Sequence, residues 1–562
     1  MNRGSKDLDR LRGGRSELES HYIDELVSGR LSRRAFLRRG SAIGISGPLL
    51  AAILAACGSS SSTSTSTGSA SSGGTPTKGG TLRVACTTPA AAVNPLTIAD
   101  AGGLCMLNQT GEFLIFDSNL KLALEPMLAL SWSPNKDGSV WTFKLRQGVT
   151  FHDGSQMTAD DVVYTFQELS DPKNASNALS TFAGVLTPAG VKSVDASTVE
   201  FQLEAPNGSF PYLVSSDNYN AIIVPKGTDY AKWQSTFVGT GAFKLSSYTQ
   251  NVGAAFVANP AYWGPKPYLS STQFKFYATQ QPAILAFQGG DVDVLSQFVP
   301  AGATAVLNSP AYRLIKLESS IHRELSMRCD QAPFTDPRVR QAVALTLDRR
   351  GMVNALLSGD GTVANDYPFG PRFASTDTSV PQRTQDIAQA KQLLSAAGHP
   401  NGLRVILTTE VYQEIPELAQ VIKADAAKAG IDINLKIETQ AAYYGKATYG
   451  NSDWLDATMS LVDYGDRGVP NVFLEAPLAS NGPWNAARFK NATYDGLVKK
   501  YVAALDLQTQ RQMAGQIERL LLAQTPIVIP YWIDGLTAST PTVGGLNPTS
   551  ISQLYLNTAY KS

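Results

Sequence analysis

The chain has 562 residues, 43% of them hydrophobic and 17% charged, and 47 basic side chains balance 47 acidic ones. At about 150 residues per domain, this length is enough for roughly three domains. A balanced charge offers no basic surface to nucleic acid, whose phosphates require several cations. The composition therefore favours a large soluble body and argues against a nucleic-acid-binding protein.

The first 56 residues have the features of an export signal. Arg33 and Arg34 form a twin-arginine motif, and residues 42–56 are an uncharged, mostly apolar run. This run of 15 residues is too short for a membrane span, which needs about 20. We predict a twin-arginine lipoprotein signal peptide over residues 1–56.

A cysteine follows the apolar run. Leu54-Ala-Ala-Cys57 resembles a lipobox, which implies cleavage before Cys57 and a lipid on its sulfur; the alternative is an ordinary signal peptide with an incidental cysteine. Residues 58–76 are almost entirely Ser, Thr and Gly, so we predict a flexible tether over residues 57–77. Without the signal peptide, 37 basic and 41 acidic side chains remain, a net charge near −4.

The first half of the remaining chain predicts strands and a capped helix. We expect strands at Thr81–Ala85, Trp141–Leu145, Val199–Leu203 and Phe243–Leu245. The second is the clearest, because Trp141, Phe143 and Leu145 alternate with polar residues. Thr158 followed by Asp161 predicts the N-terminus of a helix.

His152-Asp153-Gly154 lies between that strand and that helix. A histidine beside a carboxylate can act as a general base. No serine or cysteine partner is nearby, however, and Asp-Gly is a turn dipeptide. We therefore interpret His152 and Asp153 as part of a turn.

The second half predicts a β-α-β unit. Leu403–Thr408 and Ile431–Ile437 have strand patterns, and Pro416–Ala429 between them is helical. This order predicts parallel pairing with a right-handed crossover. Gln385–Ala397 is a further predicted helix, and Pro526–Trp532 is a predicted buried strand.

Four segments, in the expected order, resemble family 5 extracellular solute-binding proteins, the peptide, nickel and related binding components of ABC importers. They are Trp141–Phe166, Gly239–Leu245, Asn259–Gly264 and Pro333–Val343. The third has the form NPxYW, and the last has Pro337 in the first turn of a predicted helix capped by Thr335 or Asp336.

The resemblance implies the fold class. We expect an α/β, two-lobed periplasmic-binding-protein-like fold of type II, in the large peptide-binding-protein class, with an extra sub-lobe. The expected boundaries are 78–312 for lobe I with a sub-lobe inserted at about 107–230, 313–524 for lobe II, and 525–562 for a return to lobe I.

The resemblance also indicates a ligand-binding loop. Met459–Phe473 lies where the family has a loop facing the cleft, and in peptide-binding members an aspartate there pairs with the ligand's amino terminus. Asp466 lines up with that aspartate, and Asp463 is the alternative. Val469 replaces a second aspartate of the pattern. We predict that Asp466, Asp463 and Arg467 contact the ligand. The competing interpretation is a solvated loop in which these three side chains form local ion pairs.

The other candidate ligand-binding residues are one arginine outside this loop and three aromatic residues. Arg328 could bind a ligand carboxylate or phosphate, or pair with Asp330. Tyr464, Trp484 and Trp532 could pack against a ligand, although large aromatic side chains more often belong to the core.

The cysteines and histidines give little indication of a metal site or of a catalytic site. Cys86, Cys105 and Cys329 remain once Cys57 carries a lipid, so either Cys86 and Cys105 form a bridge or all three are buried thiols. Only three histidines follow the signal peptide, without metal-ligand spacing. We predict no metal, no cofactor and no catalytic residue.

The sequence therefore predicts a membrane-anchored lipoprotein on the extracytoplasmic face. It would act as a monomer that captures a peptide or similar polar solute by hinge closure and delivers it to an ABC permease and ATPase complex. The alternatives are a lipoprotein receptor for signalling and an enzyme on the same scaffold.

Overall fold

The computed structural model describes residues 76–118 and 124–562. The predicted signal peptide, the lipidation site Cys57, the motif residues Arg33 and Arg34, and nearly all of the tether lie outside the described residues.

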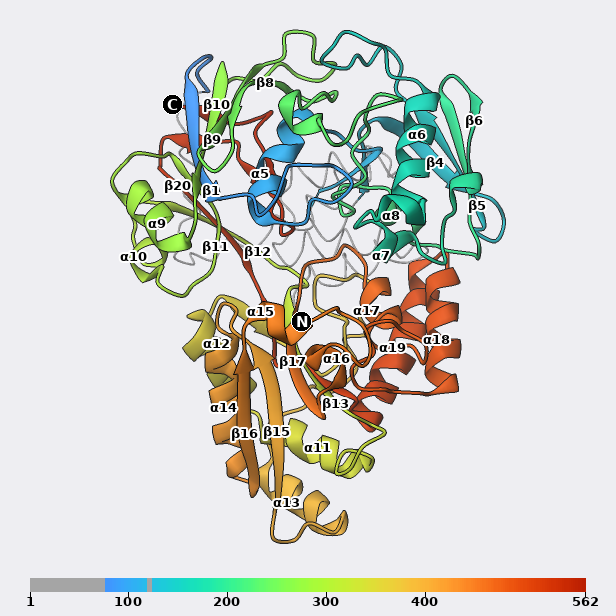
Figure 1. Cartoon of the computed structure of the whole chain (residues 1–562), viewed down its shortest axis with the longest axis vertical. Coiled ribbons are helices and arrows are strands. Elements are labelled where there is room, and N and C mark those ends of the chain that lie inside the picture. The colour runs from blue at the N-terminus through green and yellow to red at the C-terminus, as the bar shows by residue number, and fades with distance from the viewer. Residues whose placement is uncertain (1–75, 119–123) are drawn as a thin grey trace, which may run out of the picture. The chain divides into compact units, whose positions relative to one another are not determined.

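Three sheets organise the described part of the chain (Figure 1). In spatial order, sheet I contains β12 (Arg313–Leu317), β20 (Gly535–Ser539), β11 (Val294–Phe298), β1 (Thr81–Thr87), β10 (Ser271–Tyr277), β9 (Gly253–Ala258) and β8 (Phe243–Thr249). Sheet II contains β14 (Gly361–Val363), β19 (Tyr531–Ile533), β13 (His322–Met327), β17 (Met459–Tyr464), β15 (Leu403–Glu410) and β16 (Ile431–Glu438), with β18 (Ile527–Val528) also paired to β13. Sheet III contains β4 (Ala129–Pro134), β5 (Val140–Leu145), β7 (Thr198–Gln202) and β6 (Val191–Asp195).

Three two-stranded sheets complete the strands. They pair β2 (Ile115–Asp117) with β3 (Leu124–Pro126), β21 (Val543–Gly544) with β24 (Tyr560–Lys561), and β22 (Asn547–Pro548) with β23 (Leu554–Tyr555). We call the part of the chain built on sheets I and III lobe I, and the part built on sheet II lobe II. Where one lobe ends and the other begins in sequence remains a prediction.

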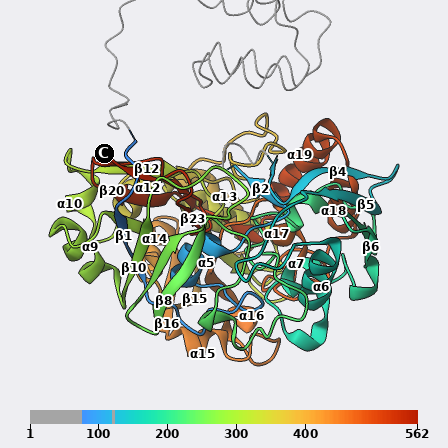
Figure 2. The same ribbon diagram turned by 90° about the horizontal axis from the view of Figure 1, so that it is seen from above.

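Helices cover the sheets. Those of lobe I are α5 (Ala101–Thr110), α6 (Ala159–Ser170), α7 (Leu179–Phe182), α8 (Phe210–Leu213), α9 (Gln280–Gln288) and α10 (Thr304–Leu307). Those of lobe II are α11 (Pro337–Thr346), α12 (Arg349–Leu357), α13 (Ile387–Ala396), α14 (Ile415–Ala427), α15 (Gln440–Tyr444), α16 (Asp453–Asp456), α17 (Asn471–Glu475), α18 (Ala492–Ala503) and α19 (Leu507–Gln524). In both views α9 and α10 lie at one side of sheet I, whereas sheet III and α6 lie at the other (Figure 2).

The chain crosses between sheets I and II twice. Residues 318–321 connect β12 of sheet I to β13 of sheet II, and Asp534 connects β19 of sheet II to β20 of sheet I. The two crossings lie side by side, because the N–H of Ile533 donates to the carbonyl of Ile321 at 2.8 Å. Strands from the C-terminal part of the chain therefore belong to both sheets.

The predicted start of the helix after Thr158 and the predicted parallel pairing of the β-α-β unit are confirmed. Helix α6 begins after Thr158, whose backbone N–H donates to the carboxylate of Asp161 at 2.7 Å. Strands β15 and β16 pair in parallel, and α14 between them buries Leu418 and Ile422 against the sheet. Periodicity placed these elements correctly because each buries one face.

The two glycines of Gly239-Thr-Gly241 allow a close approach to the end of α5. A Cβ at Gly239 would lie 2.1 Å from the carbonyl oxygen of Thr110, and a Cβ at Gly241 would lie 2.5 Å from that of Gln109. Main chain therefore packs directly on main chain, which only glycine permits at these distances.

This contact also brings the other motifs together at the end of α5. The buried carboxylate of Glu112 accepts hydrogen bonds from Thr240 Oγ1 at 2.7 Å, Tyr262 OH at 2.8 Å and Trp263 Nε1 at 2.7 Å. His152 lies 3.0 Å from the carbonyl of Gly241 through Nε2. The segments that carry the family resemblance in lobe I thus hold the lobe together, and His152 has a structural role.

The three described cysteines are free thiols. Cys86 and Cys105 are buried, and Cys105 Sγ lies 3.1 Å from Ser296 Oγ. The structure therefore has no Cys86–Cys105 bridge, and of the three thiols that the sequence predicted to be buried, Cys329 is only partly buried.

Replacing Gly239 by Ala should destabilise the protein by about 1–3 kcal/mol, since a methyl group would displace the end of α5. Chemical denaturation measures this. The control is Gly496→Ala in α18, where nothing lies within 4 Å of the added carbon and a gain of roughly 0.5–1 kcal/mol is expected. Equal effects of the two substitutions would contradict the close approach.

Candidate functional site

Asp466 follows β17 and lies between the two lobes. Its side chain is only 1% exposed. The carboxylate accepts hydrogen bonds from Ser320 Oγ at 2.8 Å, from the Ser320 N–H and from Ser550 Oγ at 2.6 Å, and it forms an ion pair with Arg372. Ser320 belongs to the first crossing between the sheets, so Asp466 is anchored to the crossing itself.

Arg372 is surrounded by carboxylates from both lobes. Besides its pair with Asp466, its Nη2 atom lies 3.3 Å from Asp117 Oδ2 and 4.0 Å from Asp217 Oδ1. Asp117 ends β2 and Asp217 follows α8, so both belong to lobe I, whereas Arg372 lies between β14 and α13 of lobe II. We call Asp117, Asp217, Ser320, Arg372, Asp466 and Ser550 the Arg372 cluster.

The charges in this cluster differ in how well they are compensated. Burial alone would raise the pKa of Asp466, but Arg372 and the hydrogen bonds from Ser550 and Ser320 outweigh it and lower that pKa. The same carboxylates raise the pKa of Arg372 despite its burial. Burial and the neighbouring Asp117 raise the pKa of Asp217 well above its ordinary value. Asp466 is thus a stable anion, and Asp217 is the poorly compensated one.

The structure brings several predicted site residues to this region. Arg467 follows Asp466, and its N–H donates to Ser320 Oγ at 2.7 Å. Tyr464 lies in a buried aromatic group, with ring centroids 6.2 Å from Trp484 and 5.3 Å from His322. The ring of Trp532 is 4.8 Å from that of His322. Tyr464 and Trp532 therefore pack on one histidine at the end of β17, and Trp484 packs on Tyr464.

Asp463 lies on the same strand in a group of its own. The hydroxyl of Tyr444 lies 2.8 Å from Asp463 Oδ1 and 2.8 Å from Glu410 Oε1. Burial, with Asp463 as a neighbouring charge, raises the pKa of Glu410. Asp463 is therefore part of a carboxyl pair in lobe II and does not contact the Arg372 cluster in the part of the chain that the structure describes.

Arg328 is not brought to this region. It follows the opposite end of β13, about 20 Å along the strand from His322 at ~3.4 Å per residue. Its Nε and Nη2 atoms form a two-point ion pair with Asp330 at 2.7 and 2.8 Å. The structure thus has the second of the two interactions that the sequence left open for Arg328.

Sequence reasoning missed Arg372, Asp117, Asp217, Ser320 and Ser550. None lies in a recognisable motif, and they come from five separate parts of the chain. The sequence held one indication of a close contact in this region, the glycine at position 468 of the predicted loop. Because it has no side chain, it leaves room for Asp217.

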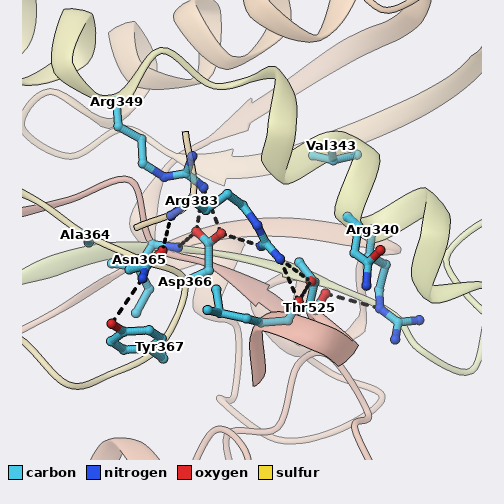
Figure 3. Close-up of polar contacts among 12 residues, drawn as sticks. Arg340, Val343, Arg349, Ala364, Asn365, Asp366, Tyr367, Arg383 and Thr525 are labelled. Atoms are coloured by element: carbon cyan, nitrogen blue, oxygen red, sulfur yellow. Dashed lines mark hydrogen bonds and ion pairs between the residues drawn. The ribbon is translucent and has the colours of Figure 1, made fainter. Parts of the chain in front are cut away.

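A second buried ion cluster lies wholly within lobe II. Figure 3 shows Arg349 and Arg383 pointing toward Asp366, to which they donate at 2.8 and 2.6 Å. The N–H of Ile529, beside β18, is a third donor to Asp366, at 3.1 Å. Because all these partners belong to one lobe, we assign this cluster to stability.

Within residues 76–118 and 124–562, no helix is both long enough and apolar enough to cross a membrane. No three His, Cys, Asp or Glu side chains of the same ranges are grouped to hold a metal ion. A small cavity is lined by Glu112, Tyr262 and Tyr555 in lobe I, and it contains none of the predicted ligand-binding residues.

Comparison with known proteins places the chain in a family. The model for the family 5 bacterial extracellular solute-binding proteins, middle domain, matches residues 123–482. The chain is 27% identical to heme-binding protein A of Haemophilus influenzae over 450 residues, which cover 75% of this chain and 81% of that protein. It is 27% identical to the periplasmic murein peptide-binding protein MppA of Escherichia coli over 467 residues, covering 76% and 85%.

A solved structure agrees on the fold. HbpA2 from Haemophilus parasuis superposes with a TM-score of 0.75 at 23% identity, covering 86% of this chain and 100% of that one. The chain therefore belongs to family 5 of the bacterial extracellular solute-binding proteins. Its mixed α/β architecture is that of the periplasmic binding proteins of the peptide-binding class, as the family resemblance predicted. The curated relatives are named as binding proteins, not as enzymes.

Asp366→Asn should destabilise lobe II by about 3–5 kcal/mol, because it keeps the shape but leaves two buried guanidinium groups without their anion. The control is Asp432→Asn, whose exposed pair with Arg404 should contribute less than about 1 kcal/mol. Urea denaturation followed by tryptophan fluorescence measures both. A loss below 1 kcal/mol for Asp366→Asn would show that the cluster is not required for stability.

Proposed function

We propose that this protein captures a peptide or similar small polar organic solute outside the cytoplasm and delivers it to an ABC permease and ATPase complex. The observation that carries this proposal is the Arg372 cluster, where buried charges of lobe I meet buried charges of lobe II. A charged solute between the lobes would make contacts of the same kind. Solute contacts with both lobes favour the closed form, so binding and hinge closure are one equilibrium.

The names of the relatives include a peptide binder but do not fix the solute. MppA is named for murein peptide and the Haemophilus protein for heme. The cluster in this chain has three carboxylates and one guanidinium, which suits a charged solute with hydrogen-bonding groups better than an apolar one. Peptides carry such groups at both ends.

We place the solute at the Arg372 cluster and the aromatic group around His322. Asp466 and Arg467 would hold the loop against the crossing, and Tyr464, Trp484 and Trp532 would pack beside the solute. Asp466 can take a solute ammonium only if Arg372 leaves it. Asp463 and Arg328 already have partners in Tyr444 and Asp330, so they would contact solute only after those interactions break.

Retention of peptide tests this function. The purified protein, mixed with a set of synthetic tripeptides and passed through gel filtration, should retain some of them, as detected by mass spectrometry. A retained peptide should reduce the radius of gyration in solution scattering and stabilise the protein by about 2.7 kcal/mol at a hundredfold excess over its Kd. Free alanine, too short to contact both lobes, is the control. Retention of no tripeptide would rule out the peptide, and binding without compaction would rule out closure.

We further propose that the protein is exported as a lipoprotein anchored through Cys57. Cys57→Ala should move the protein from the membrane fraction to the soluble fraction, because no sulfur is left to carry the lipid. The control is Cys329→Ala, which leaves the lipobox intact. A membrane fraction unchanged by Cys57→Ala, with no lipid on the wild-type Cys57 peptide, would exclude the anchor.

A further inference from the structure

His322 and Glu324 face each other inside lobe II, and each has a polar atom without a hydrogen bond. They lie two residues apart on β13, so their side chains are on the same face of the strand. Their side chains are 0% and 1% exposed, and His322 Nε2 lies 3.9 Å from Glu324 Oε2. Both atoms are buried and lack a hydrogen-bond partner among the described residues. The two unpartnered atoms are thus neighbours.

The hydrogen bond of the other ring nitrogen determines what His322 Nε2 can do. His322 Nδ1 lies 2.8 Å from the carbonyl oxygen of Ser320, and a carbonyl oxygen only accepts, so Nδ1 carries a hydrogen. In a neutral imidazole the Nε2 atom is then an acceptor, and an ionised Glu324 carboxylate is an acceptor as well. Two acceptors that face each other cannot form a hydrogen bond. One additional proton turns them into a donor and an acceptor.

The surroundings of Glu324 do not compensate its charge. In the part of the chain that the structure describes, its carboxylate accepts one hydrogen bond, from Ser326 Oγ at 3.4 Å, and no Lys or Arg forms an ion pair with it. Burial and the nearby Glu324 raise the pKa values of Tyr464 and Tyr494, so both hydroxyls stay uncharged. A water molecule between the two acceptors would leave the negative charge of Glu324 in place. A buried carboxylate of this kind is instead paired with a cation or protonated.

We propose that His322 and Glu324 share one proton, which positions Ser320 for solute capture. The proton is taken from water when the protein folds. It lies either on Nε2, which gives an imidazolium beside a carboxylate, or on Glu324, which gives a carboxylic acid that donates to Nε2. In both forms a small side-chain rotation shortens the contact to about 2.9 Å, the length of a hydrogen bond. The consequence for solute rests on the proposed function, whereas the proton itself does not.

His322 connects this proton to the crossing between the sheets. The carbonyl of Ser320 accepts from His322, and the N–H and hydroxyl of Ser320 donate to Asp466. The rings of Tyr464 and Trp532 pack on the same imidazole. Losing the proton would release the imidazole from Glu324 and so loosen both Ser320 and these rings. His322 and Glu324 are therefore positioning residues, which act on the solute through their neighbours.

Nitrogen NMR of the ligand-free protein, labelled in its histidine rings, detects the proton directly. The signals of His322 are those that shift in Glu324→Gln. At neutral pH the wild type should show either a hydrogen on both ring nitrogens of His322, or a protonated carboxyl in the infrared spectrum that disappears in Glu324→Gln. A hydrogen-free Nε2 beside an ionised Glu324 would overturn the proposal.

His152 is the internal control for this measurement. Its Nε2 atom lies 3.0 Å from the carbonyl of Gly241, and burial lowers its pKa. It has no buried carboxylate to share a proton with, so it should carry a hydrogen on one ring nitrogen only.

Two substitutions at Glu324 separate the donated hydrogen from the space that the side chain fills. Glu324→Gln has an amide N–H that donates to a neutral Nε2, so the Nδ1–H of His322 should stay protected and tripeptide retention should stay at the wild-type level. Glu324→Leu is similar in size but has no donor. Its Nδ1–H should exchange faster with water, and its affinity for a retained tripeptide should fall at least about tenfold.

The outcomes distinguish the proton from the proposed function. Equal losses in Glu324→Gln and Glu324→Leu, or unchanged retention by a folded Glu324→Leu, would overturn the positioning role. A Glu324→Leu protein that does not fold, beside a folded Glu324→Gln, would support it. A shared proton in a wild type that retains no tripeptide would support the proton site and overturn the peptide proposal instead.

Discussion

The carboxylate of Asp466 is the point on which the two lobes are joined. It is a buried anion, so its oxygens need hydrogen-bond donors. These donors are Ser320 of the crossing segment, Arg372 of lobe II and Ser550 of lobe I. A buried anion without these partners would cost several kcal/mol. The position of the predicted ligand-binding loop, and through Arg372 that of Asp117 and Asp217, follows from this one requirement.

Two kinds of buried charge serve different ends in this chain. The cluster of Asp366 with two arginines is confined to lobe II, so none of its contacts crosses between the lobes. The Arg372 cluster takes its members from both lobes, so its electrostatic balance depends on their separation. In the proposed closure, a solute that supplies a charge would alter the second cluster and leave the contacts of the first in place.

Helix ends and neighbouring strand pairs were predictable from the sequence. The partners of buried charges that lie far apart in the chain were not. The cap of α6 at Thr158 and Asp161 and the parallel pairing of β15 with β16 follow from residues close together in the chain. For Arg328, the sequence offered the neighbouring Asp330, and the structure has that pair. The partners of Asp466 lie 84 to 146 positions away, and nothing local identifies them. Charge alone does not choose among 47 acidic residues.

The late position of β19 and β20 has a consequence for protein synthesis. Strand β20 inserts between β11 and β12, and β19 inserts between β13 and β14. While the ribosome is still adding the C-terminal residues, both sheets lack an interior strand, and their open edges could pair with other nascent chains. Multidomain proteins generally fold one domain after another as they emerge. Sheet II is complete once Ile533 has been made, whereas sheet I still lacks β20, so lobe II can finish before lobe I.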